Sequence, residues 1–180
     1  MISIRPETQR DYKAIRSVVV AAFDSTEFGH DGEADLIDQL RDNYDEFMSL
    51  VAVDNDEIVG HIAFSPVSVH YENDEVHGMG LAPMAVAPDF QRKQIGKALI
   101  EYGLAELIKR GCQFVVVLGH ADYYPRFGFV PASNFGISHG FSEAPQELFF
   151  LNTLDNQNPF GINASGTAFY PVEFGRQSSI

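Results

Sequence analysis

Basic residues of this acidic chain gather at one point, between an apolar segment and a helical pattern. Arg92, Lys93 and Lys97 are three of its twelve Lys and Arg residues, whereas Asp and Glu number 25. The apolar segment ends near Val86, and the helical pattern opens at Gly96. Because the first N–H groups of a helix lack acceptors and lie at the positive end of its dipole, such a turn can bind an anion. The pattern fits either a phosphate site or a turn whose charges are only solvated.

Two common phosphate-binding motifs do not occur at this turn. A Walker-type loop requires Gly-x-x-x-x-Gly-Lys-Ser/Thr, which this sequence lacks. A dinucleotide-binding turn requires Gly-x-Gly-x-x-Gly early in a strand–helix–strand unit, with an acidic residue about 20 positions later, and it is also absent. Neither of these two classes of nucleotide-binding protein is therefore expected.

The segment from Gln91 onward resembles the signature of the GNAT superfamily of acetyltransferases, Gln/Arg-x-x-Gly-x-Gly/Ala between a strand and a helix. Gln91, Gly96 and Ala98 fall in the expected places. Gln94 stands where the signature has its first glycine. Since glycine takes left-handed backbone conformations freely, Gln94 must either adopt such a conformation or avoid it.

Other segments extend the resemblance over nearly the whole chain. Residues 122–131 (DYYPRFGFVP) look like the superfamily's Phe/Tyr-Tyr-x-Lys/Arg-x-Gly-Phe segment. Residues 60–67 (GHIAFSPV) and 118–120 (LGH) look like those of a bacterial subgroup of predicted acetyltransferases, the YhbS type. The combination of segments is more specific than any one of them.

Periodicity predicts one mixed α/β (α+β) domain. Apolar residues at helical spacing predict helices over 12–23, 33–40, 96–110 and 121–127. Alternating or continuous apolar runs predict strands over 2–4, 47–53, 58–71, 76–86, 114–118, 148–154 and 167–172. The run 114–118 is typical of a buried central strand, and the helix before it predicts a parallel βαβ step in an otherwise mostly antiparallel sheet. Residues 1–131 are expected to form the acetyltransferase core, and 132–180 to add C-terminal strands and loops.

The resemblance also implies how acetyl-coenzyme A is held and how acyl transfer proceeds. The end of the signature strand would leave backbone N–H groups free for the pantetheine and the thioester, with the Val86 N–H as oxyanion donor. Tyr124 matches the usual general acid, and Tyr123 is expected to pack. Arg126 is expected to meet a cofactor phosphate or a salt-bridge partner. The expected cofactor-binding residues are Met84, Ala85, Val86, Gln91, Arg92, Lys93, Gln94, Ile95, Gly96, Lys97, Ala98, Tyr123 and Arg126.

The general base is less defined by the sequence. Candidates are Glu33, His61, His120 and Asp122. Glu33 begins a helix where this superfamily often lines its acceptor site, although a carboxylate there also suits the helix dipole. Each His could equally be a core or rim residue, or the proton could leave through a chain of waters. His120, near Tyr124 in sequence, is the preferred candidate, and the expected catalytic set is Tyr124, His120 and Glu33.

Composition limits the remaining possibilities. The net charge of −13 argues against a nucleic-acid binder, which needs clustered Lys and Arg. A single cysteine, Cys112, allows neither an internal disulfide nor a Cys-rich metal site, and no metal is expected. No signal-like or membrane-spanning run occurs, so a cytoplasmic protein without a membrane partner is expected. The C-terminal strands offer an edge for a homodimer.

Three functions follow as expectations. The first is an N-acetyltransferase that transfers an acetyl group from acetyl-coenzyme A to a small primary amine by direct attack on the thioester. The second keeps the chemistry but takes an amine of a protein or peptide. The third is an acyl-CoA-binding sensor without turnover. This hypothesis rests on Gln94, which replaces the first glycine of the signature.

Overall fold

The computed structural model describes residues 2–24, 32–71, 74–161 and 165–178 of the chain. Its helices are α1 (Tyr12–Asp24), α2 (Glu33–Asn43) and α3 (Ile95–Lys109). Its strands are β1 (Ser3–Pro6), β2 (Met48–Asp54), β3 (Glu57–Tyr71), β4 (Asp74–Val86), β5 (Phe114–Leu118), β6 (Val130–Pro131), β7 (Ile137–His139), β8 (Phe149–Thr153) and β9 (Gly166–Phe169). Every helix and strand predicted before residue 119 is present within three residues of its expected ends.

The chain forms two compact units. Unit 1 consists of Met1–Phe64 and Ala82–Glu106, and unit 2 of Ser65–Leu81 and Leu107–Ile180. Strands β3 and β4 and helix α3 each begin in one unit and end in the other.

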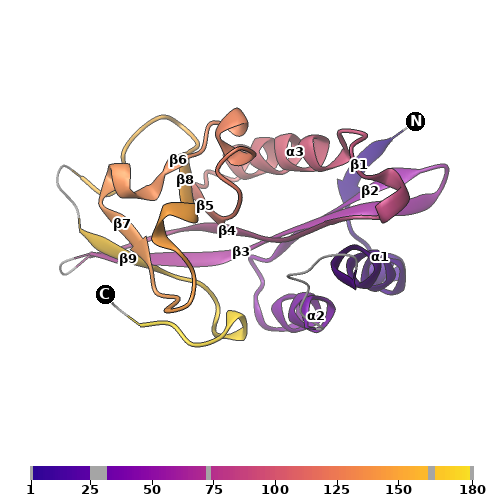
Figure 1. Ribbon diagram of the computed structural model, residues 1–180, viewed down its shortest axis with the longest axis horizontal. Helices are drawn as coiled ribbons and strands as arrows, with labels where there is room; N and C mark the ends of the chain where they lie inside the picture. The colour runs from indigo at the N-terminus through magenta and orange to yellow at the C-terminus, as the bar shows by residue number, and fades with distance from the viewer. Residues whose placement is uncertain (1, 25–31, 72–73, 162–164, 179–180) are drawn as a thin grey trace. The chain divides into compact units, whose positions relative to one another are not determined.

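In unit 1 the strand order is β1-β2-β3-β4. Strands β1, β2 and β3 are antiparallel, with Ser3 opposite Val53 and Met48 opposite Phe64. Helices α1 and α2 lie side by side on one face of these strands, and α3 lies along the other face (Figure 1). The sequence Thr8-Gln9-Arg10-Asp11 predicts a capping box, and it forms at the short 3-10 helix that leads into α1, where Asp11 accepts hydrogen bonds from the backbone N–H and the hydroxyl of Thr8 at 2.7 and 2.9 Å.

The core of unit 1 lies between the helix pair and the sheet. Val51 of β2, Ile58 of β3 and Ala85 of β4 form one buried cluster with apolar side chains of α1 and α2, among them Ile15 and Ile37. Each such side chain contributes roughly 1.5–3 kcal/mol when it leaves water. The alternation of a strand then places Met84 and Val86, the neighbours of Ala85, on the other face of the sheet.

In unit 2 the strand order is β4-β5-β8-β6. The predicted βαβ step is present, because β4 and β5 are parallel, with Met79 opposite Val115 and Gly80 opposite Val116. Strands β5 and β8 are antiparallel over all five residues of β5. Strand β9 pairs antiparallel with β3 and parallel with the short β7, a second parallel pair that the sequence did not predict.

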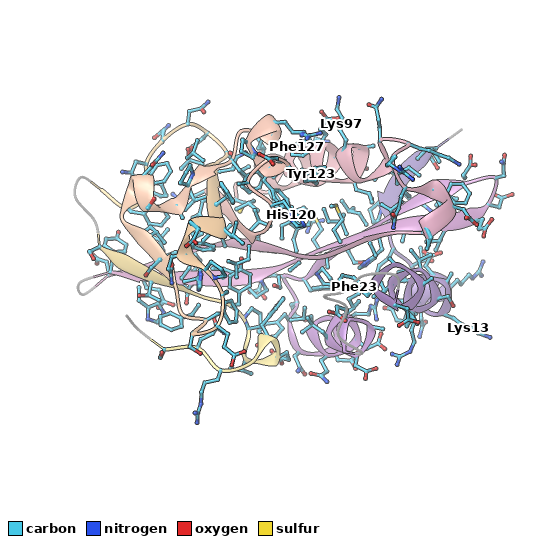
Figure 2. All side chains as sticks on the ribbon, in the orientation of Figure 1. Lys13, Phe23, Lys97, His120, Tyr123 and Phe127 are labelled. Carbon is cyan, nitrogen blue, oxygen red and sulfur yellow. The ribbon has the colours of Figure 1, made fainter. Side chains whose placement is uncertain are left out.

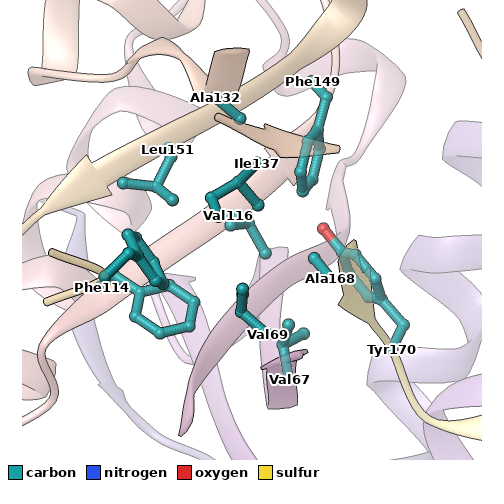
Figure 3. Close-up of a cluster of buried hydrophobic side chains, with 11 residues drawn as sticks. Val67, Val69, Phe114, Val116, Ala132, Ile137, Phe149, Leu151, Ala168 and Tyr170 are labelled. Atoms are coloured by element: carbon teal, nitrogen blue, oxygen red, sulfur yellow. The ribbon is translucent and has the colours of Figure 1, made fainter. Parts of the chain in front are cut away.

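A core of aliphatic and aromatic side chains lies in unit 2 (Figure 3). Phe114 and Val116 of β5 meet Phe149 and Leu151 of β8 in a buried cluster that also contains Tyr170. These side chains are 6% exposed or less, so the apolar run of β5 is buried as its composition predicts.

Two local predictions were wrong. The helix expected at residues 121–127 is a turn followed by a short 3-10 helix, Tyr124–Phe127, which ends at Gly128 with φ 83°. The span is too short for an α-helix, and Pro125 stands at its start. The helical spacing also predicts that Ile108 of α3 faces inward, but Ile108 is 53% exposed, because the buried face runs through Ile95, Leu99, Ile100, Leu104 and Leu107.

Candidate functional site

The loop between β4 and α3 has an unusual backbone. After a short 3-10 helix at Pro88–Phe90, Arg92 has φ 60° and Gln94 has φ 64°. Both residues are in the left-handed region, which few non-glycine residues adopt. Gln94 therefore takes the conformation that a glycine would take at this signature position. Left-handed residues on either side of Lys93, whose φ is not positive, turn successive N–H groups towards a common concavity that suits an anion.

The start of α3 adds further backbone donors. Ala98 is the first residue of this region whose N–H donates one turn back, to the Gln94 carbonyl at 3.0 Å. In the described part of the chain, the N–H groups of Ile95, Gly96 and Lys97 have no such acceptor. These donors lie at the positive end of the helix dipole, as an anion site requires.

A glycine on β3 allows this helix start to approach the sheet. Ile95 is 2% exposed, unlike the exposed loop residues before it. A Cβ on Gly60 would lie only 3.0 Å from Ile95 Cγ2 and 3.2 Å from Leu99 Cδ1. The buried Ile95 side chain thus fixes the backbone N–H donors of the loop against the sheet.

The side chains of the loop are largely exposed. Lys93 Nζ lies 4.8 Å from the centroid of the Phe90 ring, and Lys97 Nζ lies 3.8 Å from a carboxylate oxygen of Glu101. Gln91 Nε2 donates to the Val86 carbonyl at 3.2 Å and ties the loop to the end of β4. Exposed cations are screened by salt, so the backbone offers the firmer anion contacts.

The end of β4 has one unpaired edge. The Ala87 N–H donates to the Val59 carbonyl of β3 at 2.9 Å. Because N–H groups alternate along an extended chain, those of Met84 and Val86 point away from β3. Within the described residues, no ladder pair with β5 extends past Gly80. Among the described residues, the Met84 and Val86 N–H groups are therefore paired with neither β3 nor β5.

In unit 2 the segment after β5 buries one tyrosine and leaves its neighbours accessible. Tyr124 is 8% exposed, and its ring packs edge-on against Tyr123 and Phe129 with centroids 5.3 and 5.7 Å away. A Cβ on Gly119 would overlap the Tyr124 ring, so glycine is required there. Burial, and to a smaller extent the neighbouring Tyr123, raises the pKa of Tyr124 above its usual range. The phenol therefore stays protonated at neutral pH.

The other predicted residues of this segment lie within four positions of Tyr124 in the sequence, and Figure 2 labels two of them, His120 and Tyr123. The His120 carbonyl accepts from the Tyr123 N–H at 3.0 Å, and the His120 side chain is exposed. Tyr123 packs against Phe127 with centroids 5.3 Å apart, and the Arg126 guanidinium lies 4.9 Å from the Tyr123 ring centroid. Arg126 also donates to the Asp122 carbonyl at 3.0 Å. Tyr123 thus packs as expected, and Arg126 meets a ring and a carbonyl oxygen.

The remaining base candidates have different surroundings. In unit 1, Glu33 is the first residue of α2 and is half-buried, whereas His61 of β3 is fully buried. In unit 2, Asp122 is exposed. Burial, and the nearby charge of Arg41, lower the pKa of His61 to about 3, so it is neutral at physiological pH.

Sequence reasoning missed Tyr170 of unit 2. Its ring packs directly on Gly80, the last residue of β4 that pairs with β5. Its hydroxyl is buried and, among the described residues, has no hydrogen-bond partner. In Figure 3 the oxygen points towards the other side chains of the apolar cluster. A tyrosine next to a single proline near the C-terminus, as Tyr170 is next to Pro171, carries no sequence signal that could have identified it.

The described ranges contain neither a metal-ligand cluster nor a membrane-spanning helix. No three His, Cys, Asp or Glu side chains there come together as metal ligands. No helix within these ranges is both long and apolar enough to span a membrane.

Comparison with known proteins identifies the family. The sequence model of the acetyltransferase (GNAT) domain matches residues 3–132. The chain belongs to the GNAT family. The match ends where the added C-terminal strands begin, so β7, β8 and β9 lie outside it.

Two relatives from Escherichia coli K12 carry names of the same kind. The uncharacterized N-acetyltransferase YjhQ is 40% identical over 125 residues, which are 68% of this chain and 66%, just under two thirds, of YjhQ. The uncharacterized N-acetyltransferase YhbS is 33% identical over 132 residues, which are 73% of this chain and 75% of YhbS.

Two solved structures are similar over almost the whole chain. The crystal structure of YhbS from Escherichia coli in complex with CoA matches this chain with a TM-score of 0.83 and 30% identity. The match covers 97% of this chain and 92% of YhbS. A GNAT family acetyltransferase from Brucella melitensis in complex with acetyl-CoA has a TM-score of 0.78 and 32% identity, covering 97% and 99%. The fold of this chain, including its C-terminal strands, is therefore the fold of these proteins.

Proposed function

We propose that this protein is an acetyl-CoA-dependent N-acetyltransferase that transfers an acetyl group to a primary amine. The observation that carries the proposal is the backbone of the Gln91–Lys97 loop in a GNAT chain, because its left-handed residues and free helix-start N–H groups suit an anion. CoA and acetyl-CoA in the two similar crystal structures support the choice of acyl donor.

The donor would be held mainly by backbone groups. N–H groups of the Arg92–Lys97 stretch would bind the pyrophosphate, and Arg92 and Lys93 would add long-range attraction. The free N–H groups of Met84 and Val86 would face the pantetheine and the thioester carbonyl. Bound in this way, acetyl-CoA supplies the acetyl group as an activated thioester.

The reaction forms one C–N bond and breaks one C–S bond. The uncharged amine nitrogen attacks the thioester carbon, and negative charge develops on the carbonyl oxygen, where the Val86 N–H would stabilise it. The amine gives up one proton, and the departing sulfur gains one. We assign that gained proton to the Tyr124 hydroxyl, which burial keeps protonated.

The amine must reach the thioester uncharged. An alkylamine with the usual pKa of about 10.4 is neutral in only about one molecule in 2,500 at pH 7. His120 and Glu33 remain our candidates for assisting its deprotonation, with a chain of waters as the alternative. A small molecule and a protein or peptide amine are both compatible with this chemistry.

A thiol-release assay tests the proposal. The protein is incubated with acetyl-CoA and a panel of amines consisting of spermidine, kanamycin, p-anisidine and a lysine-containing peptide. We expect free CoA to appear with at least one of them, and Tyr124→Phe to lower kcat at least 100-fold without changing the Kd of CoA. Tyr123→Phe, which removes the adjacent hydroxyl, should retain most activity.

The contrary result is equally clear. Micromolar binding of CoA without thiol release on any amine would identify an acyl-CoA-binding sensor instead of an enzyme. Equal losses in Tyr123→Phe and Tyr124→Phe would remove Tyr124 from the role of acid while leaving the acetyltransferase assignment intact.

A further inference from the structure

A chain of hydrogen bonds in unit 1 ends at a buried histidine. Arg41 of α2 donates to the two carboxylate oxygens of Glu7 at 2.7 and 3.0 Å. The Ser49 hydroxyl of β2 donates to Glu7 at 2.5 Å and lies 2.8 Å from Nε2 of His61. His61 itself is 0% exposed. We call these residues, Arg41, Glu7, Ser49 and His61, the His61 chain.

Proton counting fixes the direction of each bond. Ser49 has a single hydroxyl proton, and ionised Glu7, paired with Arg41, can only accept. The Ser49 proton therefore lies on the Glu7 side. Nε2 of His61 must then donate to the Ser49 oxygen, so the imidazole carries its proton on Nε2.

The other ring nitrogen is consequently an acceptor. In this tautomer Nδ1 has a free lone pair, and among the described residues it has no hydrogen-bond partner although it is buried. Since buried polar atoms in proteins are almost always paired, such an atom needs an explanation. Each of the other three side chains of the His61 chain makes at least two hydrogen bonds.

His61 lies on the same face of the sheet as Ala85 of β4. Nε2 points to Ser49 on β2, and the two nitrogens lie on different edges of the ring, so Nδ1 is directed away from Ser49. The strand that follows β3 on the side away from β2 is β4. Val51, the register partner of His61, shares its buried cluster with Ala85 of β4, which lies between Met84 and Val86.

We propose that Nδ1 of His61 accepts a hydrogen bond from an N–H of the acceptor amine, directly or through one water, and that Ser49 and Glu7 hold the tautomer required. This inference rests on the proposed function and names the residue that would bind its acceptor. It makes His61 a substrate-binding residue, and Ser49 and Glu7 positioning residues.

The surroundings also select the form of the amine. The charge of Arg41 and the burial of the ring both disfavour a cation at this nitrogen. The carboxylates nearest the ring through the chain, Glu7 and Asp38, are already engaged by Arg41. The site therefore favours an uncharged N–H donor. A weakly basic amine such as p-anisidine should be a better substrate than a permanently charged alkylamine of similar size.

Two substitutions separate the roles of the two ring nitrogens. Glutamine places its amide near the position of Nε2, so His61→Gln can still donate to Ser49 but offers no acceptor at Nδ1. Asparagine places its amide near Nδ1, so His61→Asn can still accept there but loses Ser49. Ser49→Ala removes the hydrogen bond that holds the proton of His61 on Nε2. Ser65→Ala, which removes the buried hydroxyl of a serine on β3, is its matched control.

The test combines kinetics with ¹⁵N spectra of histidine-labelled protein. We expect His61→Gln to raise the KM for p-anisidine at least tenfold with a twofold change or less in the Kd of CoA. His61→Asn should raise the KM for p-anisidine less than His61→Gln does. Ser49→Ala should raise this KM three- to tenfold, and Ser65→Ala less than twofold. In wild-type protein, the Nδ1 resonance should be that of an unprotonated nitrogen and should shift when p-anisidine is added with CoA.

Each contrary outcome is specific. A protonated Nδ1 in the free protein, or an unchanged KM in His61→Gln with normal CoA binding, overturns this inference and leaves the acetyltransferase assignment in place. If no amine releases thiol, the proposed function fails, and the spectra still decide the inference. The inference is overturned if no amine of the panel shifts the Nδ1 resonance of His61.

Discussion

In unit 1, the Gln91–Lys97 loop presents backbone N–H groups and leaves its polar side chains exposed, whereas in unit 2, the Tyr123–Phe129 segment buries the side chain of Tyr124 among aromatic rings. The two regions carry the proposed binding and proton-transfer roles in different ways. In the loop, backbone conformation matters more than side-chain identity. In the tyrosine segment, one hydroxyl and the space around its ring matter most. Substitutions should therefore have opposite patterns in the two regions.

The largest effect is expected from crowding the buried tyrosine. Gly119→Ala places a methyl group where the Tyr124 ring lies, so the ring must move or the backbone must shift. We expect a loss of about 1–3 kcal/mol in the free energy of unfolding and a fall in kcat comparable to that of Tyr124→Phe. Chemical denaturation and the thiol-release assay measure the two. Gly111→Ala is a control for a glycine with no neighbour within 4 Å, although its own φ of 75° adds strain. An unchanged kcat in Gly119→Ala would contradict the assigned role of the ring position.

A backbone change in the loop comes next. Gln94→Pro fixes φ near −65°, which is incompatible with the observed 64°, and removes one N–H donor. We expect the Kd of CoA to rise about 30-fold, equivalent to about 2 kcal/mol. Gln94→Gly keeps the conformation, and its Kd should stay within about threefold of the wild type. Calorimetric titration with CoA distinguishes them. If glycine tightened binding tenfold or more, Gln94 would be a costly departure from the signature instead of a tolerated one.

A second buried group, His61, should affect stability through pH. Its pKa falls from 6.5 to about 3 on folding, so the unfolded chain binds the proton first as the pH falls. The contribution of neutral His61 to the free energy of unfolding is fully present above pH 6.5. It is lost as the pH drops from 6.5 towards 3. Between pH 7 and pH 5 the wild type should lose about 1–2 kcal/mol through this group. His61→Gln should flatten the dependence, whereas His77→Gln at an exposed site should not. An equal slope in all three proteins would contradict the buried neutral imidazole.

The smallest effect is expected from an exposed cation of the loop. Lys93→Ala should weaken CoA binding only about twofold at low salt and not at all in high salt, because exposed charges are strongly screened. Lys13→Ala on α1, labelled in Figure 2, is the matched exposed control and should have no effect. A tenfold loss in Lys93→Ala would mean that side chains, and not the backbone, dominate in this loop.

The sequence predicts well what depends on local patterns. The apolar run 114–118 became β5 over the same five residues, and the helix predicted from Gly96 is α3, which begins at Ile95. It predicts poorly what depends on distant partners. The β7–β9 pair joins residues about 29 positions apart, and both strands are too short for a clear periodicity.

The same limit applies to the candidate site. The His61 chain joins residues from β2, α2, β3 and the start of the chain, so no spacing in the sequence announces it. Gln94 shows the converse. The departure from glycine was visible in the sequence, but only the backbone angle shows that the loop keeps the conformation of a glycine there. The residue that assists deprotonation of the amine stays a prediction. So does the assignment of residues 1–180 to a single domain.

The unpaired edge of β4 also has a consequence for measurement. Amide hydrogens that are not held in a ladder exchange with solvent quickly, and a bound ligand that accepts from them slows the exchange. The amides of Met84 and Val86 should thus exchange faster than that of Ala87, which donates to Val59. Addition of CoA should slow the first two and leave the third unchanged. The strand end would then serve as an internal probe of occupancy, readable before any acceptor amine is known.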